Sequence, residues 1–253
     1  MAGRDDLVSF CDELLEIERF EDYGPNGLQV PGRQEVEMVA TGVSANRDFL
    51  SAGVESGADL LIAHHGLFFG DGGGGLTEQL AARLRIVLEA EVSVAGYHLP
   101  LDAHREIGNN ALLCGELGLE PDPVDFGSVK GRPIGVVGVS EDGITAAELV
   151  QRVSSLYGRE PLHFDSGPQT VRRVGIVTGA GSSLLAEAGG ARLDAFLTGE
   201  PAEQAMGDAR ELGVHFIAAG HYATERSGVR RLGELLAERF GIEHRFIDVP
   251  NPV

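Results

Sequence analysis

The strongest constraint on the fold is a regular alternation of short apolar runs with longer segments in which apolar residues recur at helical spacing. The apolar runs cover residues 36–43, 59–63, 92–97, 133–139, 172–177, 194–198 and 214–219. The helical patterns between them cover 46–56, 77–90, 109–117, 145–156, 183–189, 201–212 and 225–240. Strand followed by helix, repeated, predicts an α/β protein with largely parallel or mixed sheets covered by helices.

The two ends of the chain complete this pattern. Apolar residues from Leu7 to Leu15 predict an amphipathic helix that ends before the turn-rich YGPNG at 23–27. Thr145 and Glu148 have the spacing of a capping box at the start of the helix over 145–156. A final strand is expected at 244–250.

A chain of 253 residues can form one large α/β domain or two smaller lobes. The acidic, proline-rich segment 119–133 interrupts the alternation and is the best candidate for a join. We therefore expect an N-terminal α/β lobe over 1–125 and a C-terminal α/β lobe over 126–253, with the last helix and strand packing back on the first lobe. A ligand site is expected in the cleft between the two packed lobes.

The net charge of the chain limits which molecules can bind to it. The 39 acidic residues against 20 Lys and Arg give a net charge of -19, which repels nucleic-acid phosphates and anionic membranes. We expect a small-molecule substrate and no nucleic acid bound through a basic face. A phosphorylated ligand, such as a nucleotide, would need metal ions or helix ends to reverse the local potential.

Cysteine usage and apolar run lengths predict a cytoplasmic protein. Cys11 and Cys114 lie far apart among apolar residues at helical spacing, so both read as small buried hydrophobes rather than as a disulfide or a thiol redox pair. The start of the chain lacks the apolar core of a signal peptide, and no apolar run approaches the roughly 18 residues of a membrane span.

Side chains that bind metals follow three of the expected strands. They are His64 and His65 in IAHHGLFF, His98, Asp102 and His104 in YHLPLDAH, and His221 and Glu225 in GHYATE. Ligands in open α/β sheets gather beyond the carboxyl ends of strands, so the three segments together predict a metal site. A single-ion or purely structural cluster is the remaining alternative.

Each segment taken alone is a weak signal. Neighbouring His64 and His65 would point to opposite faces of a strand, but Gly66 indicates a turn that would let them converge. Exposed or core histidines explain such a pair equally well. His221 and Glu225 are four residues apart and so share one helical face, a spacing that also occurs in ordinary surface pairs.

The second of these three segments, YHLPLDAH, also contains a carboxylate that could bind the metal. Asp102 would supply the hard, anionic ligand that a mixed site for Zn, Mn, Fe or a similar ion needs. Pro100 disfavours helix at Leu99, so the segment is expected to be extended or turning. For His98 and His104, structural and functional roles are equally consistent with the sequence.

In their order, these motifs resemble the Nif-three-like family, also known as GTP cyclohydrolase I type 2 homologues or dinuclear-metal-centre proteins. The segments that carry the resemblance are YGPNGLQV at 23–30, IAHHGLFF at 62–69, YHLPLDAHREIGNN at 97–110, FLTGE at 196–200 and GHYATE at 220–225. The resemblance covers nearly the whole chain, whose length matches the short form of the family without an inserted domain.

The resemblance implies two divalent metal ions per chain and a homohexameric, toroidal ring. Its implied ligands are His64, His65, Asp102, His221 and Glu225, with Glu225 bridging the ions and Asp102 bound to one of them. It also implies that His98 lies near the metals as a candidate catalytic group rather than as a ligand.

Two features depart from the family pattern. Ser44 stands where the family often has Asp, and the DGGGG at 71–75, which is expected to be a flexible loop, is unusually rich in glycine.

Two further turns have an uncertain role. The turn at 179–183 could hold an anion near Ser182 and Ser183, although tight-turn packing is favoured. Thr198 and Glu200, in FLTGE, are equally consistent with a cap and with substrate contact.

Two functional hypotheses follow. The first is metal-dependent hydrolysis: the family label points to opening of the purine ring of GTP at carbon 8, with His98 moving a proton, and a phosphoesterase would use the same centre. The second is a metal-binding or protein-interaction scaffold without turnover. A serine hydrolase is disfavoured because the chain has no GxSxG motif.

Overall fold

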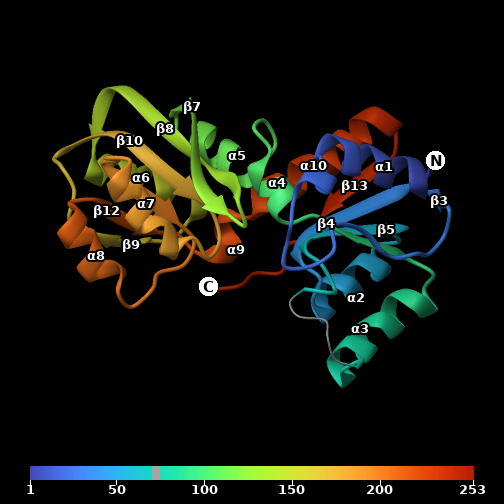
Figure 1. Cartoon of the computed structure of the whole chain (residues 1–253). Helices are drawn as coiled ribbons and strands as arrows, with labels where there is room; N and C mark the ends of the chain where they lie inside the picture. Colours follow the sequence, from blue (N-terminus) through green and yellow to red (C-terminus); the bar gives the residue numbers. More distant parts are fainter. Residues whose placement is uncertain (70–74) are drawn as a thin grey trace. The chain divides into compact units, whose positions relative to one another are not determined.

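The computed structural model describes residues 1–69 and 75–253. The chain forms two compact units: unit 1 comprises residues 1–101 and 228–250, and unit 2 comprises residues 102–227 and 251–253. Each unit has its own mixed sheet with helices packed on it, which confirms the predicted α/β class (Figure 1). The glycine-rich stretch 71–74, expected to be a flexible loop, lies outside the described residues.

Unit 1 is built on a five-stranded sheet. In spatial order its strands are β13 (Glu243–Phe246), β4 (Met38–Ser44), β5 (Leu60–His65), β6 (Ser93–Gly96) and β2 (Gly27–Val30). The first four are parallel, and only β2 runs antiparallel to its neighbour. A small separate ladder joins β1 (Ala2–Gly3) to β3 (Glu35–Val36). The carboxyl ends of β4, β5 and β6 therefore share one edge of the sheet.

Helices cover both faces of this sheet. Figure 1 shows α1 (Arg4–Leu14) and α10 (Arg226–Phe240) on one face, and α2 (Arg47–Glu55) and α3 (Glu78–Glu89) on the other. One apolar core joins α2, α3 and the sheet. Its members include Phe49, Leu50, Leu61, Val87 and Val94. Cys11 is buried on α1, as expected for a small hydrophobe.

Unit 2 is built on a six-stranded sheet. In spatial order its strands are β7 (Glu120–Val129), β8 (Arg132–Thr145), β10 (Thr170–Val177), β11 (Ala195–Thr198), β12 (His215–Ala218) and β9 (Leu162–Phe164). The three inner strands β10, β11 and β12 are parallel, and the outer strands pair antiparallel.

Helices α5 (Asn109–Glu116) and α6 (Ala146–Tyr157) pack on one face of this sheet, where Cys114, Val153 and Ile217 belong to a single apolar core. The opposite face carries a row of edge-to-face or tilted rings from Phe126, Phe196 and Phe216. Three shorter helices follow the strands: α7 (Leu185–Gly190), α8 (Ala205–Leu212) and α9 (His221–Thr224). The capping box predicted for Thr145 and Glu148 is confirmed at the start of α6.

The structure corrects the expectation that Pro100 keeps its segment out of a helix. Leu99–Ala103 form helix α4, with Pro100 in its first turn. The first N–H groups of a helix have no acceptor within it, so the missing N–H of proline costs nothing there. The Asp22 carboxylate accepts a hydrogen bond from the Leu99 N–H at 2.9 Å and so caps the helix from another segment.

The proline-rich segment 119–133, expected to join the lobes, instead forms β7 and its turn into β8 within unit 2. Pro121 and Pro123 are tolerated because β7 is the edge strand of the sheet, where a missing N–H leaves no neighbour without a partner. The covalent passage from unit 1 to unit 2 lies between Leu101 and Asp102, and the chain returns between Ser227 and Gly228. Among the described residues, no helix is long and apolar enough to cross a membrane.

Candidate metal centre

Three imidazoles cluster at the carboxyl edge of the unit 1 sheet. His64 and His65 end β5, and His98 follows β6 directly before α4. The ring centroids are 4.8 Å apart for His64 and His65, and 4.9 Å apart for His64 and His98. One nitrogen from each ring lies within 4.8 Å of the others, so the group could hold a metal ion. The predicted convergence of the two neighbouring histidines is confirmed.

Backbone and hydroxyl partners orient His64 and His65. Nδ1 of buried His64 lies 2.9 Å from the carbonyl oxygen of Tyr97. A carbonyl only accepts, so Nδ1 carries the proton and Nε2 carries the lone pair that a metal requires. Nδ1 of His65 lies 3.0 Å from Oγ of Ser44, the residue opposite it in the β4–β5 ladder. The group beside this imidazole is therefore a neutral hydroxyl rather than a carboxylate.

His98 is held by a carboxylate. Its Nδ1 lies 2.6 Å from Oδ1 of Asp22, and its backbone N–H donates to Oδ1 of Asn26 at 2.8 Å. Asp22 also accepts a hydrogen bond from Nδ2 of Asn26 at 2.9 Å. Burial by itself raises the pKa of Asp22, but hydrogen bonds and charge from His98, together with the Asn26 amide and the Tyr23 N–H, lower it overall below its usual range. Asp22 therefore faces the imidazole as a carboxylate at neutral pH.

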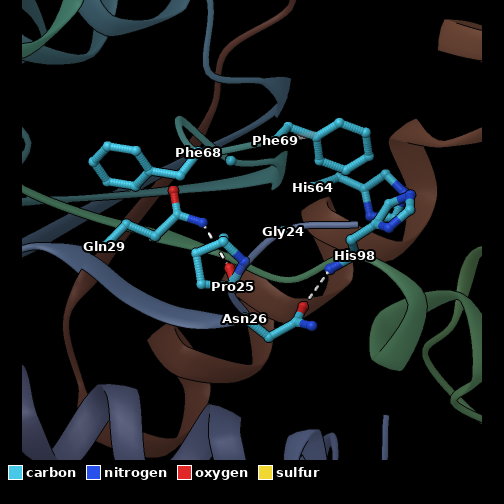
Figure 2. Close-up of a pocket in the computed structure, with 10 residues that line it drawn as sticks. Gly24, Pro25, Asn26, Gln29, His64, Phe68, Phe69 and His98 are labelled. Carbon is cyan, nitrogen blue, oxygen red and sulfur yellow. Dashed lines mark hydrogen bonds between the residues drawn. The ribbon is translucent and has the colours of Figure 1, made fainter. Parts of the chain in front are cut away.

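A small pocket opens beside these rings, lined entirely by unit 1 (Figure 2). Its volume is about 10 Å³, close to what one water molecule needs. Figure 2 shows His64 and His98 side by side with Phe69 next to them. Gln29 supports the wall by accepting a hydrogen bond from the Leu67 N–H at 2.7 Å and donating one to the Pro25 carbonyl at 2.7 Å. A Cβ on Gly66 would lie 2.3 Å from Nε2 of Gln29, so glycine there leaves room for the Gln29 amide in this position.

In unit 2, His221 and Glu225 make the contact that their spacing predicts. Nε2 of His221 lies 3.0 Å from Oε2 of Glu225, and Nδ1 hydrogen-bonds to Glu200. Burial lowers the pKa of His221, but the two carboxylates outweigh it and raise the pKa to about 9. The ring therefore carries a proton at neutral pH in this state, and a metal ion would have to displace it. Glu200, for which the sequence left a cap and a substrate contact open, orients this imidazole.

Asp102 and Glu225 are both buried and belong to unit 2. A carboxylate oxygen of Asp102 lies within 4.8 Å of one from Glu225. Oδ1 of Asp102 accepts a hydrogen bond from Nδ2 of Asn109 at 2.8 Å. A Cβ on Gly179, whose φ is +66°, would lie 2.1 Å from Oε1 of Glu225, so glycine is required at this turn. Two buried carboxylates in such proximity favour a cation, because burial of like charges is costly.

The remaining candidates have structural contacts. Nδ1 of His104 accepts hydrogen bonds from the N–H groups of Glu106 and Ile107, both at 3.2 Å, and so closes a turn. Oγ1 of Thr198 accepts from the Gly181 N–H at 3.0 Å and donates to the Gly179 carbonyl at 3.1 Å. Oγ of Ser182 donates to the Glu200 carbonyl at 2.7 Å. These bonds support the tight-turn interpretation of 179–183.

Sequence reasoning missed two kinds of residue. Asn26 was recognised only as part of the turn-rich YGPNG at 23–27, and Asp22, directly before that motif, was not singled out. Their spacing of four residues and their short polar side chains are nevertheless typical of residues that hydrogen-bond nearby backbone. A separate cluster of His163, Asp165 and His215 in unit 2 also has ligand atoms within 4.8 Å of one another.

The family model described as Duf34/NIF3 (NGG1p interacting factor 3) matches residues 2–252. The chain belongs to the Duf34/NIF3 family. The resemblance seen in the sequence motifs is thereby confirmed. Curated relatives include a protein of Pseudomonas aeruginosa, 43% identical over 247 residues, and one of Escherichia coli, 40% identical over 248 residues. Both are named GTP cyclohydrolase 1 type 2 homolog, and the matches cover 97% and 98% of each chain respectively.

Solved structures of this family have the same fold. The protein ybgI, a structural-genomics target of unknown function, is 39% identical with a TM-score of 0.93, and the match covers 99% of this chain and 100% of that one. TTHA1606 from Thermus thermophilus is 34% identical with a TM-score of 0.86 over the same shares. This Duf34/NIF3 chain therefore has a known fold and several groups of His, Asp and Glu that could hold metal ions.

Proposed function

We propose that this chain is a metal-dependent hydrolase that binds two divalent ions through His64, His65, Asp102, His221 and Glu225. The observation that carries the proposal is the orientation of these side chains within each unit. Unit 1 presents two neighbouring imidazoles, and a backbone carbonyl sets the tautomer of one of them, His64. Unit 2 presents two buried carboxylates beside a third imidazole. Nitrogen and carboxylate donors together fit Zn, Mn, Fe or a similar ion.

Two of the proposed ligands lie close in sequence to the points where the chain passes from one unit to the other. Asp102 is the first residue of unit 2, four residues after His98, and lies in the helix that spans the passage between the units. Glu225 lies two residues before Ser227, where the chain leaves unit 2 again. The two carboxylates of the proposed ligand set therefore flank the passages of the chain, one at each.

Two such ions would supply Lewis acidity and lower the pKa of a coordinated water. The residues of the chain then have separate roles. His98 moves a proton at Nε2, because Asp22 accepts the hydrogen bond of Nδ1 and stabilises the ring when it is charged. Phe69 beside it keeps bulk water from one side of the imidazoles, with its ring centroid 4.8 Å from that of His98.

Exposed aromatic side chains favour a planar substrate over a simple phosphoester. The side chains of Tyr23 and Phe69 are 48% and 46% exposed, and their ring centroids lie 6.0 and 4.8 Å from that of His98. Stacking of a base on such rings contributes about 1–3 kcal/mol. Opening of the purine ring in GTP is the reaction that we favour, with phosphoester hydrolysis as the second. The net charge of -19 requires the metal ions to attract an anionic nucleotide.

The test compares protein loaded with two equivalents of Mn, Zn or Fe on GTP and on model phosphoesters. Turnover that is lost in His65→Ala and Glu225→Gln, but kept in His244→Gln, supports the hydrolase. His244 is a suitable control because it is half-buried in unit 1 against Thr41, outside the imidazole cluster. Stoichiometric metal binding without turnover on either substrate class would instead support the scaffold hypothesis. The family resemblance also implies a homohexamer, which we propose for this chain. Light scattering coupled to size-exclusion chromatography tests this proposal by measuring the molar mass of the assembly.

A further inference from the structure

A second group of metal-ligand side chains lies at the other end of unit 2. His163 is in the edge strand β9, Asp165 follows that strand, and His215 is the first residue of β12. Strands β9 and β12 pair antiparallel with His163 opposite Ile217. Since side chains alternate between faces, His215 and Ile217 share a face, and His163 therefore lies on the same face as His215.

The donor atoms of this group have the separations of a tetrahedral metal site. Nε2 of His163 lies 3.4 Å from Nδ1 of His215, and Oδ1 of Asp165 lies 3.2 Å from the same Nδ1. Ligands about 2.0–2.1 Å from a tetrahedral ion lie roughly 3.3–3.4 Å from one another. Two imidazoles and one carboxylate therefore converge at about the spacing that zinc requires.

Local hydrogen bonds set the tautomer of His215 in the way that a metal ligand needs. Nε2 lies 2.9 Å from the carbonyl oxygen of Pro168, so this nitrogen carries the proton. Nδ1 therefore holds a lone pair, and the Gly167 N–H donates to it at 3.2 Å. A metal ion bound here would replace the Gly167 N–H as the partner of Nδ1 and would also neutralise the Asp165 carboxylate 3.2 Å away. Donation from the second nitrogen to a backbone carbonyl is the usual arrangement of a metal-bound histidine.

The loop after β9 is shaped to fit over this imidazole. A Cβ on Gly167 would lie 2.4 Å from Cδ2 of His215 and 2.6 Å from the Asp194 carbonyl oxygen, so the loop can approach the ring only with glycine there. His215 is buried, whereas the Asp165 side chain is 80% exposed. The group therefore has a fixed imidazole at its base and one side open to solvent, where a water or an external ligand can complete the coordination.

We propose that His163, Asp165 and His215 form a separate, mononuclear site for a divalent cation of the zinc type. The site is distinct from the one proposed above, since His215 begins β12 and His221 lies beyond the other end of that strand, which is about 10 Å long. Mixed nitrogen and oxygen donors with an open position suit Zn²⁺, Co²⁺ or Ni²⁺.

The experiment is equilibrium dialysis of the full chain, stripped of metal, against buffers of fixed free Zn²⁺ concentration. We expect His163→Gln to bind one Zn²⁺ fewer per chain than the unmodified protein. We expect Asp165→Asn to bind the same ion about 10-fold or more weakly, since even groups behind the ligands change affinity by that factor. The matched control, His244→Gln, should keep the full count. The experiment measures the difference in bound Zn²⁺ per chain between two proteins, so the result does not depend on how many ions the other site holds.

Both variants are expected to fold like the unmodified protein, because His163 lies on an edge strand and the Asp165 side chain is largely exposed. Equal melting temperatures of the metal-free proteins verify this. Equal zinc counts for the unmodified protein and His163→Gln would overturn the site. An unchanged zinc affinity in Asp165→Asn would overturn the three-donor arrangement. Co²⁺ gives a second readout: intense visible absorption of tetrahedral cobalt should be reduced in His163→Gln, and an identical spectrum would count against the proposal.

Discussion

Nδ1 of His98 lies 2.6 Å from Oδ1 of Asp22, a residue 76 positions earlier in the chain. This carboxylate also caps α4 through the Leu99 N–H. One side chain therefore positions both the imidazole and the start of the helix that carries Asp102. The pairing assigns a role to Asp22, which lies directly before the predicted turn at 23–27 and was not singled out from the sequence.

Replacement of Asp22 by Asn should slow turnover more than it weakens metal binding. The amide keeps the size of the side chain but removes the charge that stabilises a protonated His98. General acid–base groups contribute about 10²–10⁴-fold to rate, and we expect Asp22→Asn to lose a large part of that factor in kcat. Metal content, measured by elemental analysis, should stay the same. A variant that retains its kcat would show that His98 moves no proton in the slow step.

The same carboxylate should make stability depend on pH. The pKa of Asp22 is lowered in the folded protein, so its contribution to stability is present above the unfolded value of about 3.9 and is lost as the pH falls through the folded value. The difference in free energy of unfolding between the protein and Asp22→Asn should be constant above about pH 5 and shrink below about pH 4. Urea titrations across this range measure it. A difference that grows on acidification would contradict the assignment.

Gly179→Ala should be more harmful than Gly213→Ala. Both glycines have φ near +66°, so both substitutions carry the backbone strain of the left-handed region, about 1 kcal/mol. A Cβ at Gly213 meets nothing within 4 Å, whereas one at Gly179 lies 2.1 Å from Oε1 of Glu225. We expect Gly179→Ala to lose about 1–3 kcal/mol more and to weaken metal binding. Thermal unfolding with and without metal measures both effects, and equal losses would contradict the role of Gly179.

Chelation should lower the melting temperature of the protein but have little effect on Glu225→Gln. A metal that binds only the folded state stabilises it by about 2.7 kcal/mol at 100 times its dissociation constant. Glu225→Gln removes a buried carboxylate ligand and with it most of the affinity of the protein for the metal. The measurement is a pair of melting curves with Mn or Zn and with chelator, and Glu187→Gln is the control because Glu187 binds the Gly127 N–H away from His221 and Asp102. An equal response of Glu225→Gln would remove Glu225 from the ligand set.

Local pattern predicted most of the elements because each is decided by neighbouring residues. Apolar periodicity located β4, β5, β6, β10, β11 and β12 to within a few residues, and the capping box at Thr145 was identified from four letters. The segments that were predicted wrongly are those whose conformation depends on residues far away in the sequence. Pro100 is compatible with α4 because it lies in the first turn, and Asp22 fixes the start of that helix by accepting from the Leu99 N–H. The prolines near 121 fit a strand because that strand lies at the sheet edge.

The sequence by itself determined the fold class, the family and the side chains able to bind metal, because the identity and spacing of ligand residues are properties of short segments. The tertiary structure decided which nitrogen of His64 carries its proton, which carboxylate holds His98, and that His163, Asp165 and His215 meet. Those facts depend on pairs of atoms brought together across tens of residues. Hydrogen-bond direction and donor spacing exist only once strands and loops are packed against one another.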